Sequence, residues 1–380
     1  MKEKTYSKAR GSVLNGLTGA MLSLSYTICM CAVTGIPLLG AFLCICVCAL
    51  FCVRMKKGFF VPDILLLLPV YFYTASAAPL WLLPGAILGG ILISLVFFRL
   101  SKKNNFTFLP GALGIALALA LTILLTDNYF GIGSFGATPW EMLKNYRYLG
   151  FHPNFSGLLY GTITLFAMIT FPFKFRDINK KLPAEFLTLL VPLLINLLLN
   201  PVKELSVINE LHFTPLSLTG AKEMLFAEPS LGDFSVLLKT ALITGCCFFI
   251  LNSNKEDNKR LITVNALSGL FSGFPVRKTG IHGYTILSAV ITITVSAFVI
   301  FACTPVLCRI PEHCAGAMLI VAAWQRVPYK AFSFMKGRNP ILSVIFIIII
   351  CAAFVFADTL TASIVALVIA ESGASEGAGI

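Results

Sequence analysis

The sequence predicts an all-α polytopic membrane protein with about 12–14 transmembrane segments, because apolar runs of about 20 residues recur along its length. Of its 380 residues, 57% are hydrophobic and only 12% are charged, and the mean hydropathy is +0.88. A soluble domain carries about 25% charged residues, so this composition excludes a water-soluble fold. The apolar runs are continuous rather than alternating, which is typical of helices and not of strands.

Basic residues gather in short clusters at the ends of apolar runs. The formal net charge is +12, and the clusters follow the runs that end at Val53, Phe98, Phe173, Leu251 and Trp324. This is the positive-inside pattern, and it predicts a cytoplasmic N-terminus in a multi-pass protein of the cell membrane, a bacterial inner membrane. The basic residues form no stripe with interleaved aromatic side chains, so we expect no nucleic acid as a partner.

The types of side chain that hold metals or perform catalysis are scarce or badly spaced. Most of the twelve Cys residues lie inside apolar runs, where thiols behave as small hydrophobic groups, and the chain has only four His. No CxxC pair is present, so we expect no metal and no cofactor. The apolar runs also lack nucleophile–base pairs and clustered carboxylates, so we do not expect an enzyme.

We divide the chain into two membrane repeats with short flanking segments. The divisions are a cytoplasmic leader (1–12), a first membrane repeat (13–200), an extracytoplasmic loop (201–233), a second membrane repeat (234–370) and a disordered tail (371–380). The predicted apolar segments, in order, are 13–34, 38–53, 59–77, 79–98, 109–126, 158–173, 183–199, 234–251, 260–276, 284–306, 315–324, 340–356 and 359–370.

Two of these segments differ from ordinary spanning helices. Segment 260–276 is rich in small and polar residues, among them Asn265 and Ser268, and it stops at Pro275. Segment 59–77 is short, is interrupted by prolines and contains Asp63. A pair of interrupted segments in corresponding places of two halves indicates a transporter built from inverted repeats.

Several motifs, in order along the chain, resemble those of the SulP (sulfate permease) anion transporter family. Residues 261–276 (LITVNALSGLFSGFPV) are similar to the family pattern N-x-x-SGLFGG-x-P-V, and residues 311–324 (PEHCAGAMLIVAAW) are similar to IP-x-x-x-LAGILLVAAW. Residues 15–20 and 32–40 resemble the first helix of the family, and residues 61–63 resemble the start of its third, half-length helix.

The resemblance implies the uracil-permease-like or SulP fold, in which fourteen segments form two inverted repeats with broken half-helices. Half-helices three and ten would meet at mid-membrane, with their N-termini pointing at a bound anion. Free N–H groups and a partial positive charge at a helix start suit an anion without a full charge in the bilayer. The sequence departs from the family at Cys247, where a Glu is usual, and after Pro275, where the next half-helix is shortened. We also expect no STAS domain, which the family usually carries.

The candidate substrate-binding residues follow from this resemblance. They are Ser25 and Tyr26 on the first helix, Asp63, Ile64 and Leu65 at the start of the first half-helix, and Thr279, Gly280 and His282 where the second should begin. Each has a plainer interpretation as well. Asp63 would cap its helix, the hydroxyls of Ser25 and Tyr26 would bond within packed helices, and the residues after Lys278 would form a polar turn.

We therefore predict a secondary active transporter of a small inorganic or carboxylic anion of the sulfate, bicarbonate, chloride or dicarboxylate class. It would work by alternating access at a mid-membrane site, through proton symport or exchange. A nucleobase-type permease on the same fold, or a degenerate membrane scaffold that does not transport, stays open. The expected partners are the anion and the lipid bilayer, and a homodimer is an open alternative to a monomer.

Overall fold

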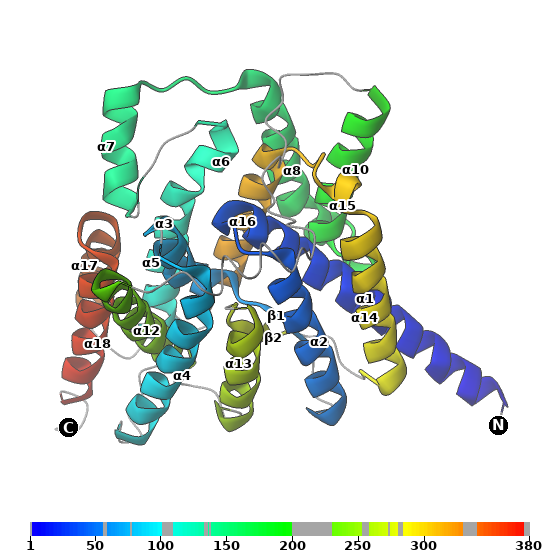
Figure 1. Cartoon of the computed structure of the whole chain (residues 1–380), viewed down its shortest axis with the longest axis horizontal. Coiled ribbons are helices and arrows are strands. Elements are labelled where there is room, and N and C mark those ends of the chain that lie inside the picture. Colours follow the sequence, from blue (N-terminus) through cyan, green and yellow to red (C-terminus); the bar gives the residue numbers. More distant parts are fainter. Residues whose placement is uncertain are drawn as a thin grey trace.

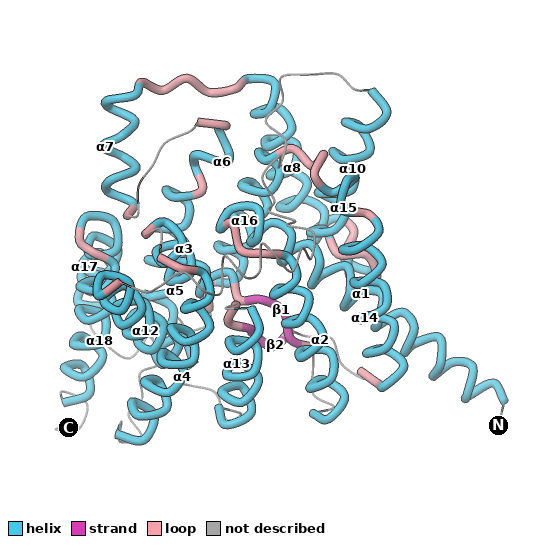
Figure 2. The backbone as a smooth tube through the Cα atoms, in the orientation of Figure 1, coloured by secondary structure: helices cyan, strands magenta, loops and turns pink. Residues whose placement is uncertain are grey.

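The computed structural model describes residues 2–55, 59–76, 78–100, 109–132, 136, 138–199, 230–252, 258–272, 274–279, 284–329 and 340–375. Helices make up nearly all of these residues, and two short strands lie near the centre of the molecule (Figures 1 and 2). The apolar runs account for this, because a backbone in lipid must satisfy its own hydrogen bonds, and a helix does so within one segment.

The first half contains ten helices and one strand among the described residues. The helices are α1 (Lys2–Thr34), α2 (Leu38–Met55), α3 (Leu67–Ala75), α4 (Leu83–Leu100), α5 (Leu109–Leu124), α6 (Thr126–Phe130), α7 (Pro139–Leu149), α8 (Phe155–Lys174), α9 (Arg176–Asn179) and α10 (Ala184–Leu199). The strand β1 (Phe60–Pro62) is followed by the 3-10 turn η1 (Ile64–Leu66), which leads directly into α3, and the 3-10 turn η2 (Leu80–Leu82) leads into α4.

The described part of the second half contains seven helices and one strand. They are α12 (Leu231–Asn252), α13 (Asn258–Ser272), β2 (Val276–Lys278), α14 (Ile286–Ala302), α15 (Thr304–Leu307), α16 (Glu312–Arg326), α17 (Pro340–Phe356) and α18 (Thr359–Ser375). Helix α18 extends five residues into the tail that we predicted to be disordered, so that prediction is wrong for 371–375. Residues 201–229 of the predicted loop lie outside the described residues.

Helices of membrane-spanning character occur throughout the described residues. Three are long and apolar enough to cross a bilayer alone, namely Arg10–Thr34, Phe155–Lys174 and Leu231–Asn252, and most of the others are shorter apolar helices. Many apolar side chains on the outside are exposed, such as Phe173 at 83% and Leu198 at 81%. An apolar exterior around a buried core is what lipid solvation requires, which makes the chain a multi-pass membrane protein.

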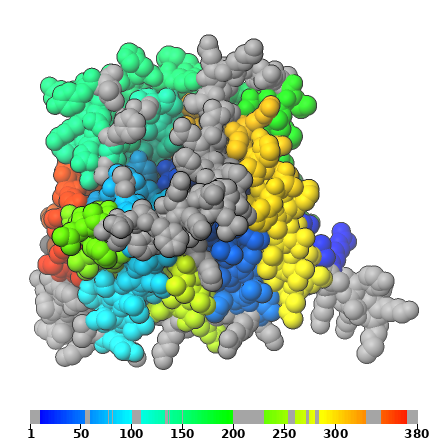
Figure 3. All heavy atoms as spheres, in the orientation of Figure 1, coloured from blue at the N-terminus to red at the C-terminus, as the bar shows by residue number. Residues whose placement is uncertain are grey.

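The pattern of helix packing reveals two inverted repeats. Helix α4 packs most closely against α12, and α14 packs in the same way against α1. The pairs α2–α14 and α13–α4 match one another, as do α8–α16 and α17–α5, and α1–α10 and α12–α18. Figure 3 shows α14 (yellow) lying against α2 (blue) on one face. A two-fold relation that exchanges α1 with α12, α2 with α13, α4 with α14, α5 with α16, α8 with α17 and α10 with α18 generates all of these pairs.

The two matched pairs α1–α14 and α4–α12 are held by close approach of small residues. A Cβ atom added to Gly90 of α4 would lie 2.6 Å from Cβ of Thr244 on α12, and one added to Gly16 of α1 would lie 2.7 Å from the carbonyl oxygen of Ser288 on α14. On α14, Ser288 and Thr292 donate hydrogen bonds of 2.8 Å to carbonyls of α1. Small residues and hydroxyl bonds of this kind are the usual means of joining helices in membranes.

Strands β1 and β2 lie on the axis between the repeats and pair antiparallel. The register places Phe60 opposite Lys278 and Pro62 opposite Val276, with Val61 and Arg277 in the middle. The two ends of the ladder are equivalent, because the N–H of Asp63 donates to the carbonyl of Pro275 (2.8 Å) and the N–H of Thr279 donates to that of Phe59 (2.6 Å). Asp63 and Thr279 therefore occupy matching positions in the two repeats.

The described residues of the second repeat contain no counterpart of the half-helix α3 that the resemblance implies. In the first repeat 17 residues (63–79) separate β1 from η2, and twelve of them (64–75) form η1 and α3. In the second repeat only seven residues (279–285) separate β2 from α14. Because seven residues cannot hold a twelve-residue helix and its connections, the expectation that half-helices three and ten meet at mid-membrane is wrong for this chain.

Candidate functional site

The remaining half-helix begins at a buried acid. Asp63 is 6% exposed, and its carboxylate accepts a hydrogen bond of 3.3 Å from the N–H of Leu65. The carbonyl of Asp63 accepts from the N–H of Leu66, and Ile64 and Leu65 are fully buried. Asp63 thus caps the helix, which is the plainer of the two interpretations that the sequence analysis gave for it. Its negative charge lies at the end of the helix that carries a partial positive charge.

A second acid and a cation lie beside this helix start, joined through Tyr26. The hydroxyl of Tyr26 donates to Oε1 of Glu185 on α10 (3.0 Å) and accepts from Nη2 of Arg326 on α16 (3.1 Å). The guanidinium of Arg326 also lies 5.3 Å from the centre of the Tyr26 ring, within the range of a cation–π interaction. Arg326 interacts electrostatically with both Asp63 and Glu185. We call these four residues the Tyr26 cluster: Tyr26, Asp63, Glu185 and Arg326.

The strand pair holds the Arg326 end of α16 in place. Nη1 of Arg277 donates to the carbonyl oxygen of Arg326 at 3.0 Å, and Arg277 pairs with Val61 in the middle of the ladder. Helix α16 also contacts η1. The last turn of α16 therefore packs where the two repeats meet, and it brings a full positive charge there.

Polar residues of α13 fix β2 rather than a ligand. Asn265 accepts from the N–H of Val276 (2.6 Å) and donates to its carbonyl (3.0 Å) and to that of Leu261. Ser268 donates to the carbonyl of Phe274 (2.6 Å). Both side chains are fully buried. Asn265 and Ser268 thus hold the chain where it reverses after α13, and they set the position of β2 in the ladder.

The structure brings together four of the eight predicted site residues. Tyr26, Asp63, Ile64 and Leu65 lie at or next to the helix start. Ser25 lies apart, since its hydroxyl donates to the carbonyl of Met21 in its own helix (2.8 Å) and it lines an apolar crevice between α1, α10, α14 and α15.

Thr279 follows β2 and continues its pairing with the first repeat, because both its N–H and its hydroxyl (2.9 Å) donate to the carbonyl of Phe59. Gly280 and His282 lie outside the described residues.

Sequence reasoning missed two members of the cluster. Arg326 follows an apolar run and has the position of an interfacial cation, and Glu185 lies in the first turn of α10, where an acid is favoured by the helix dipole. One signal was available for both, since the two residues end or begin segments that are shorter than a full span. Such segments stop inside the protein, so their terminal charges face protein and not headgroups.

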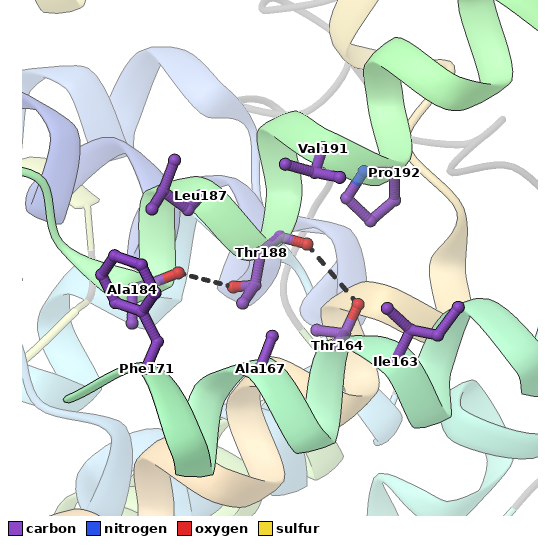
Figure 4. Close-up of a pocket in the computed structure, with 9 residues that line it drawn as sticks. All are labelled: Ile163, Thr164, Ala167, Phe171, Ala184, Leu187, Thr188, Val191 and Pro192. Carbon is purple, nitrogen blue, oxygen red and sulfur yellow. Dashed lines mark hydrogen bonds between the residues drawn. The ribbon is translucent and has the colours of Figure 1, made fainter. Parts of the chain in front are cut away.

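Two crevices between helices are apolar and unsuited to an anion. One, of about 220 Å³, lies between α8 and α10 and is drawn in Figure 4. Its two hydroxyls are engaged, since Thr188 donates to the carbonyl of Ala184 (2.9 Å) and Thr164 donates to that of Thr188 (3.5 Å). The other, of about 200 Å³, contains Ser25. Because neither presents a free polar group, the Tyr26 cluster is the better candidate for a charged substrate.

The fold matches solved structures of anion transporters, although no family model matches the chain and no curated protein matches its sequence. A structure of SLC26A9 aligns with 95% of this chain at a TM-score of 0.73 and 12% identity, and the chain spans 64% of that protein. The transmembrane domain of a cyanobacterium bicarbonate transporter, BicA, aligns over 95% of this chain and 97% of its own length, with a TM-score of 0.62 and 17% identity.

An inward-facing structure of the murine Slc26a9 anion transporter aligns over 97% of this chain and 68% of its own length, at a TM-score of 0.65 and 11% identity. These alignments cover both repeats, and they agree with the motifs found in the sequence and with the packing symmetry. The chain therefore has the all-α fold of the SulP/SLC26 transmembrane domains, as its resemblance to the SulP family predicts.

Proposed function

We propose that this protein is a secondary transporter of a small anion of the sulfate, bicarbonate, chloride or dicarboxylate class, which binds at the Tyr26 cluster. The observation that carries the proposal is the buried start of a half-length helix beside a guanidinium, at the axis between two inverted repeats. Buried ionisable groups inside a membrane protein are costly and mark substrate or proton pathways. The solved neighbours carry the names of anion and bicarbonate transporters, which supports the same class.

Proton symport is the mode of coupling that the charges favour. The carboxylates of Asp63 and Glu185 balance the guanidiniums of Arg277 and Arg326, so an added monovalent anion leaves the site with a net negative charge. Uncompensated charge in a buried site is expensive. Asp63 also competes with an anion for the N–H groups of the helix start, as its bond to Leu65 demonstrates. A proton on Asp63 removes both obstacles.

The groups around this acid are few among the described residues. Arg326 from α16 interacts with it electrostatically. Arg326 in turn contacts Tyr26 from α1 and accepts from Arg277 of β2 at its carbonyl, and Tyr26 donates to Glu185 from α10. Lys278 is exposed at the far end of the ladder. Asp63 is the acid that touches the helix start, so we assign the proton to it. Uptake is then expected to rise as the external pH falls.

A non-transporting membrane scaffold is the second candidate, and one observation favours it. The seven-residue link after β2 removes the second helix start from the site, and with it about half a unit of positive charge. The packing of the repeats survives this loss, so the fold alone does not require transport.

Uptake into proteoliposomes separates the two candidates. The purified chain is reconstituted, and labelled sulfate, bicarbonate, chloride, fumarate and uracil are each offered with and without an inward proton gradient. We expect accumulation of at least one anion, driven by the gradient. In Asp63→Asn we expect anion exchange to persist while accumulation is lost, because the neutral amide imitates the protonated acid. Asp177→Asn, which changes an exposed acid, serves as the control and should leave accumulation unchanged.

If none of the anions is taken up, the transporter proposal is refuted and the non-transporting scaffold is the better interpretation. Uptake of uracil alone would favour a nucleobase permease instead. If Asp63→Asn accumulates anions as the unchanged protein does, the assignment of the proton to Asp63 is wrong even though transport stands.

A further inference from the structure

The two repeats contribute unequally to the positive potential of the site. In the first repeat the start of η1 and α3 brings a partial positive charge of about half a unit. In the second repeat the matching residue, Thr279, has its N–H and its hydroxyl on the carbonyl of Phe59, and only six residues remain before α14. A site for an anion at this axis therefore needs another source of positive charge.

Arg326 is a partly buried cation next to the strand that precedes the shortened link. It is the last residue of α16, and its backbone carbonyl is held by Arg277, in the strand of the second repeat that precedes the shortened link. Its guanidinium interacts with Asp63, which caps the helix start of the first repeat. The cation thus lies on the helix that packs against η1, close enough to the surviving helix start to interact with Asp63.

The guanidinium keeps most of its hydrogen-bonding capacity free. A guanidinium has five N–H donors in a planar fork. Within the described residues, the one hydrogen bond that Arg326 donates from its side chain goes to Tyr26. Neither Asp63 nor Glu185 forms an ion pair with it there, since the only ion pair among those residues joins Lys180 to Asp177. The remaining donors can bind an oxyanion in the bidentate manner that favours Arg.

Tyr26 and Glu185 are suited to position this cation. The Tyr26 ring lies under the guanidinium at 5.3 Å, and its hydroxyl contacts the guanidinium on one side and the Glu185 carboxylate on the other. Tyr26 is buried, with 1% of its surface exposed. An arginine held over a ring and bonded at one edge presents its other edge in a fixed direction.

We propose that the guanidinium of Arg326 binds the anion, and that this side chain substitutes for the half-helix absent from the second repeat. Tyr26 acts as its positioning residue. The inference rests on the proposed transport function for its substrate class, but the binding it describes is measurable without transport. A cation in the last turn of a helix also offsets the partial negative charge there, so the experiment has to separate binding from stability.

Two substitutions of Arg326 test the inference, with a matched control. Arg326→Gln removes the charge, Arg326→Lys keeps the charge without the fork, and Arg260→Gln removes an exposed cation at the start of α13. Sulfate, bicarbonate and fumarate are titrated at constant ionic strength. The measurements are thermal stabilisation of the purified protein by each anion and, in proteoliposomes, KM and the maximal rate.

We expect Arg326→Gln to weaken binding by about 10-fold to 100-fold, the range for a lost hydrogen bond to a charged group. Arg326→Lys should weaken binding by about 3-fold to 10-fold, because a bidentate contact becomes a single one. In both, KM should rise with little change in maximal rate. Without anion, Arg326→Gln should lower the melting temperature more than Arg326→Lys, because Asp63 and Glu185 lose a compensating charge, so binding is measured as the further stabilisation that each anion adds to each variant. Arg260→Gln should match the unchanged protein.

Several results would overturn the inference. An unchanged KM in Arg326→Gln would do so, as would a fall in melting temperature with unaltered anion stabilisation. If Arg326→Gln is not recovered folded, Arg326→Lys decides alone, and an unchanged affinity in it counts against the bidentate contact. Anion stabilisation without uptake would refute transport but keep this site, whereas uptake with Arg326-independent KM would keep transport and refute the site.

Discussion

In the first repeat β1 leads into a half-length helix that starts at Asp63, whereas in the second repeat β2 leads through seven residues into α14. The main helix packing around this difference is the same in both repeats, because the most extensive helix pairs of one repeat, such as α1–α14 and α2–α14, have counterparts in the other, α4–α12 and α4–α13. The comparison teaches that the scaffold and the site have separate requirements. The helix packing and the strand ladder do not need a second half-helix, whereas an anion needs the positive charge which that helix would bring.

The largest effect on this comparison is expected from Asn265→Ala, which releases β2 from α13. The amide of Asn265 satisfies both backbone groups of Val276 in a fully buried place, so its loss leaves two polar groups without partners. We expect a loss of about 2–5 kcal/mol in the free energy of unfolding, measured by thermal or denaturant unfolding in detergent.

The control for Asn265→Ala is Thr170→Ala, which removes an exposed hydroxyl that bonds only within its own helix. It should unfold as the unchanged protein does. If Asn265→Ala were equally neutral, β2 would not depend on α13, and the ladder would be held by the strand pairing alone.

A smaller effect is expected from two glycine substitutions at matching interfaces. Gly90→Ala places a methyl group 2.6 Å from Thr244 and 2.9 Å from the carbonyl of Ala241, and Gly16→Ala places one 2.7 Å from the carbonyl of Ser288. Overpacking of this kind costs about 1–3 kcal/mol. The two variants should lose similar amounts of unfolding free energy, because the helix pairs α4–α12 and α1–α14 are equivalent.

Gly11→Ala provides the comparison for both, since nothing lies within 4 Å of its added Cβ. It should leave stability unchanged or raise it, as Ala favours a helix. A large loss of unfolding free energy in one of the two variants and none in the other would show that the two interfaces are not equivalent.

The smallest effect is expected from Thr279→Val, at the position that matches Asp63. The substitution removes the hydroxyl bond to the carbonyl of Phe59 but keeps the N–H bond to the same atom. One hydrogen bond with a remaining partner contributes about 0.5–1.5 kcal/mol. We expect a loss at the lower end of that range and unchanged anion affinity. A rise in KM for anions would place Thr279 in the site after all.

Most of the fold followed from the sequence because its physical causes are local. A span must be apolar over its whole length, so the apolar helices could be placed from composition along the chain, whereas the short or polar helices α6, α7 and α9 were not predicted. The unusual segment 260–276 was recognisable for the same reason, since Asn265 and Ser268 have no place on a lipid-facing helix. The shortened link after β2 was also predictable, because the sequence has few residues between Pro275 and the next apolar run.

The site was less predictable because its members come together only through tertiary packing. Ser25 and Tyr26 are neighbours in sequence, yet they point about 100° apart around α1, and periodicity did not decide which one faces the axis. Glu185 and Arg326 lie at ends of helices, where a charge has an ordinary explanation at the membrane interface. Only the contact of α16 with η1 and α1 distinguishes Arg326 from an interfacial cation.

The strand ladder also sets the order in which the molecule is completed during synthesis. The N–H of Asp63 is held by Pro275, and Thr279 by Phe59, so the start of the first half-helix acquires its anchor only after roughly 210 further residues have left the ribosome. At about 5–20 residues per second this takes roughly 10–40 s. During that interval Asp63 and the strand β1 are without their backbone partners from the second repeat. Synthesis of the second repeat is therefore what closes the first, and the two halves expressed as separate chains should assemble through this ladder.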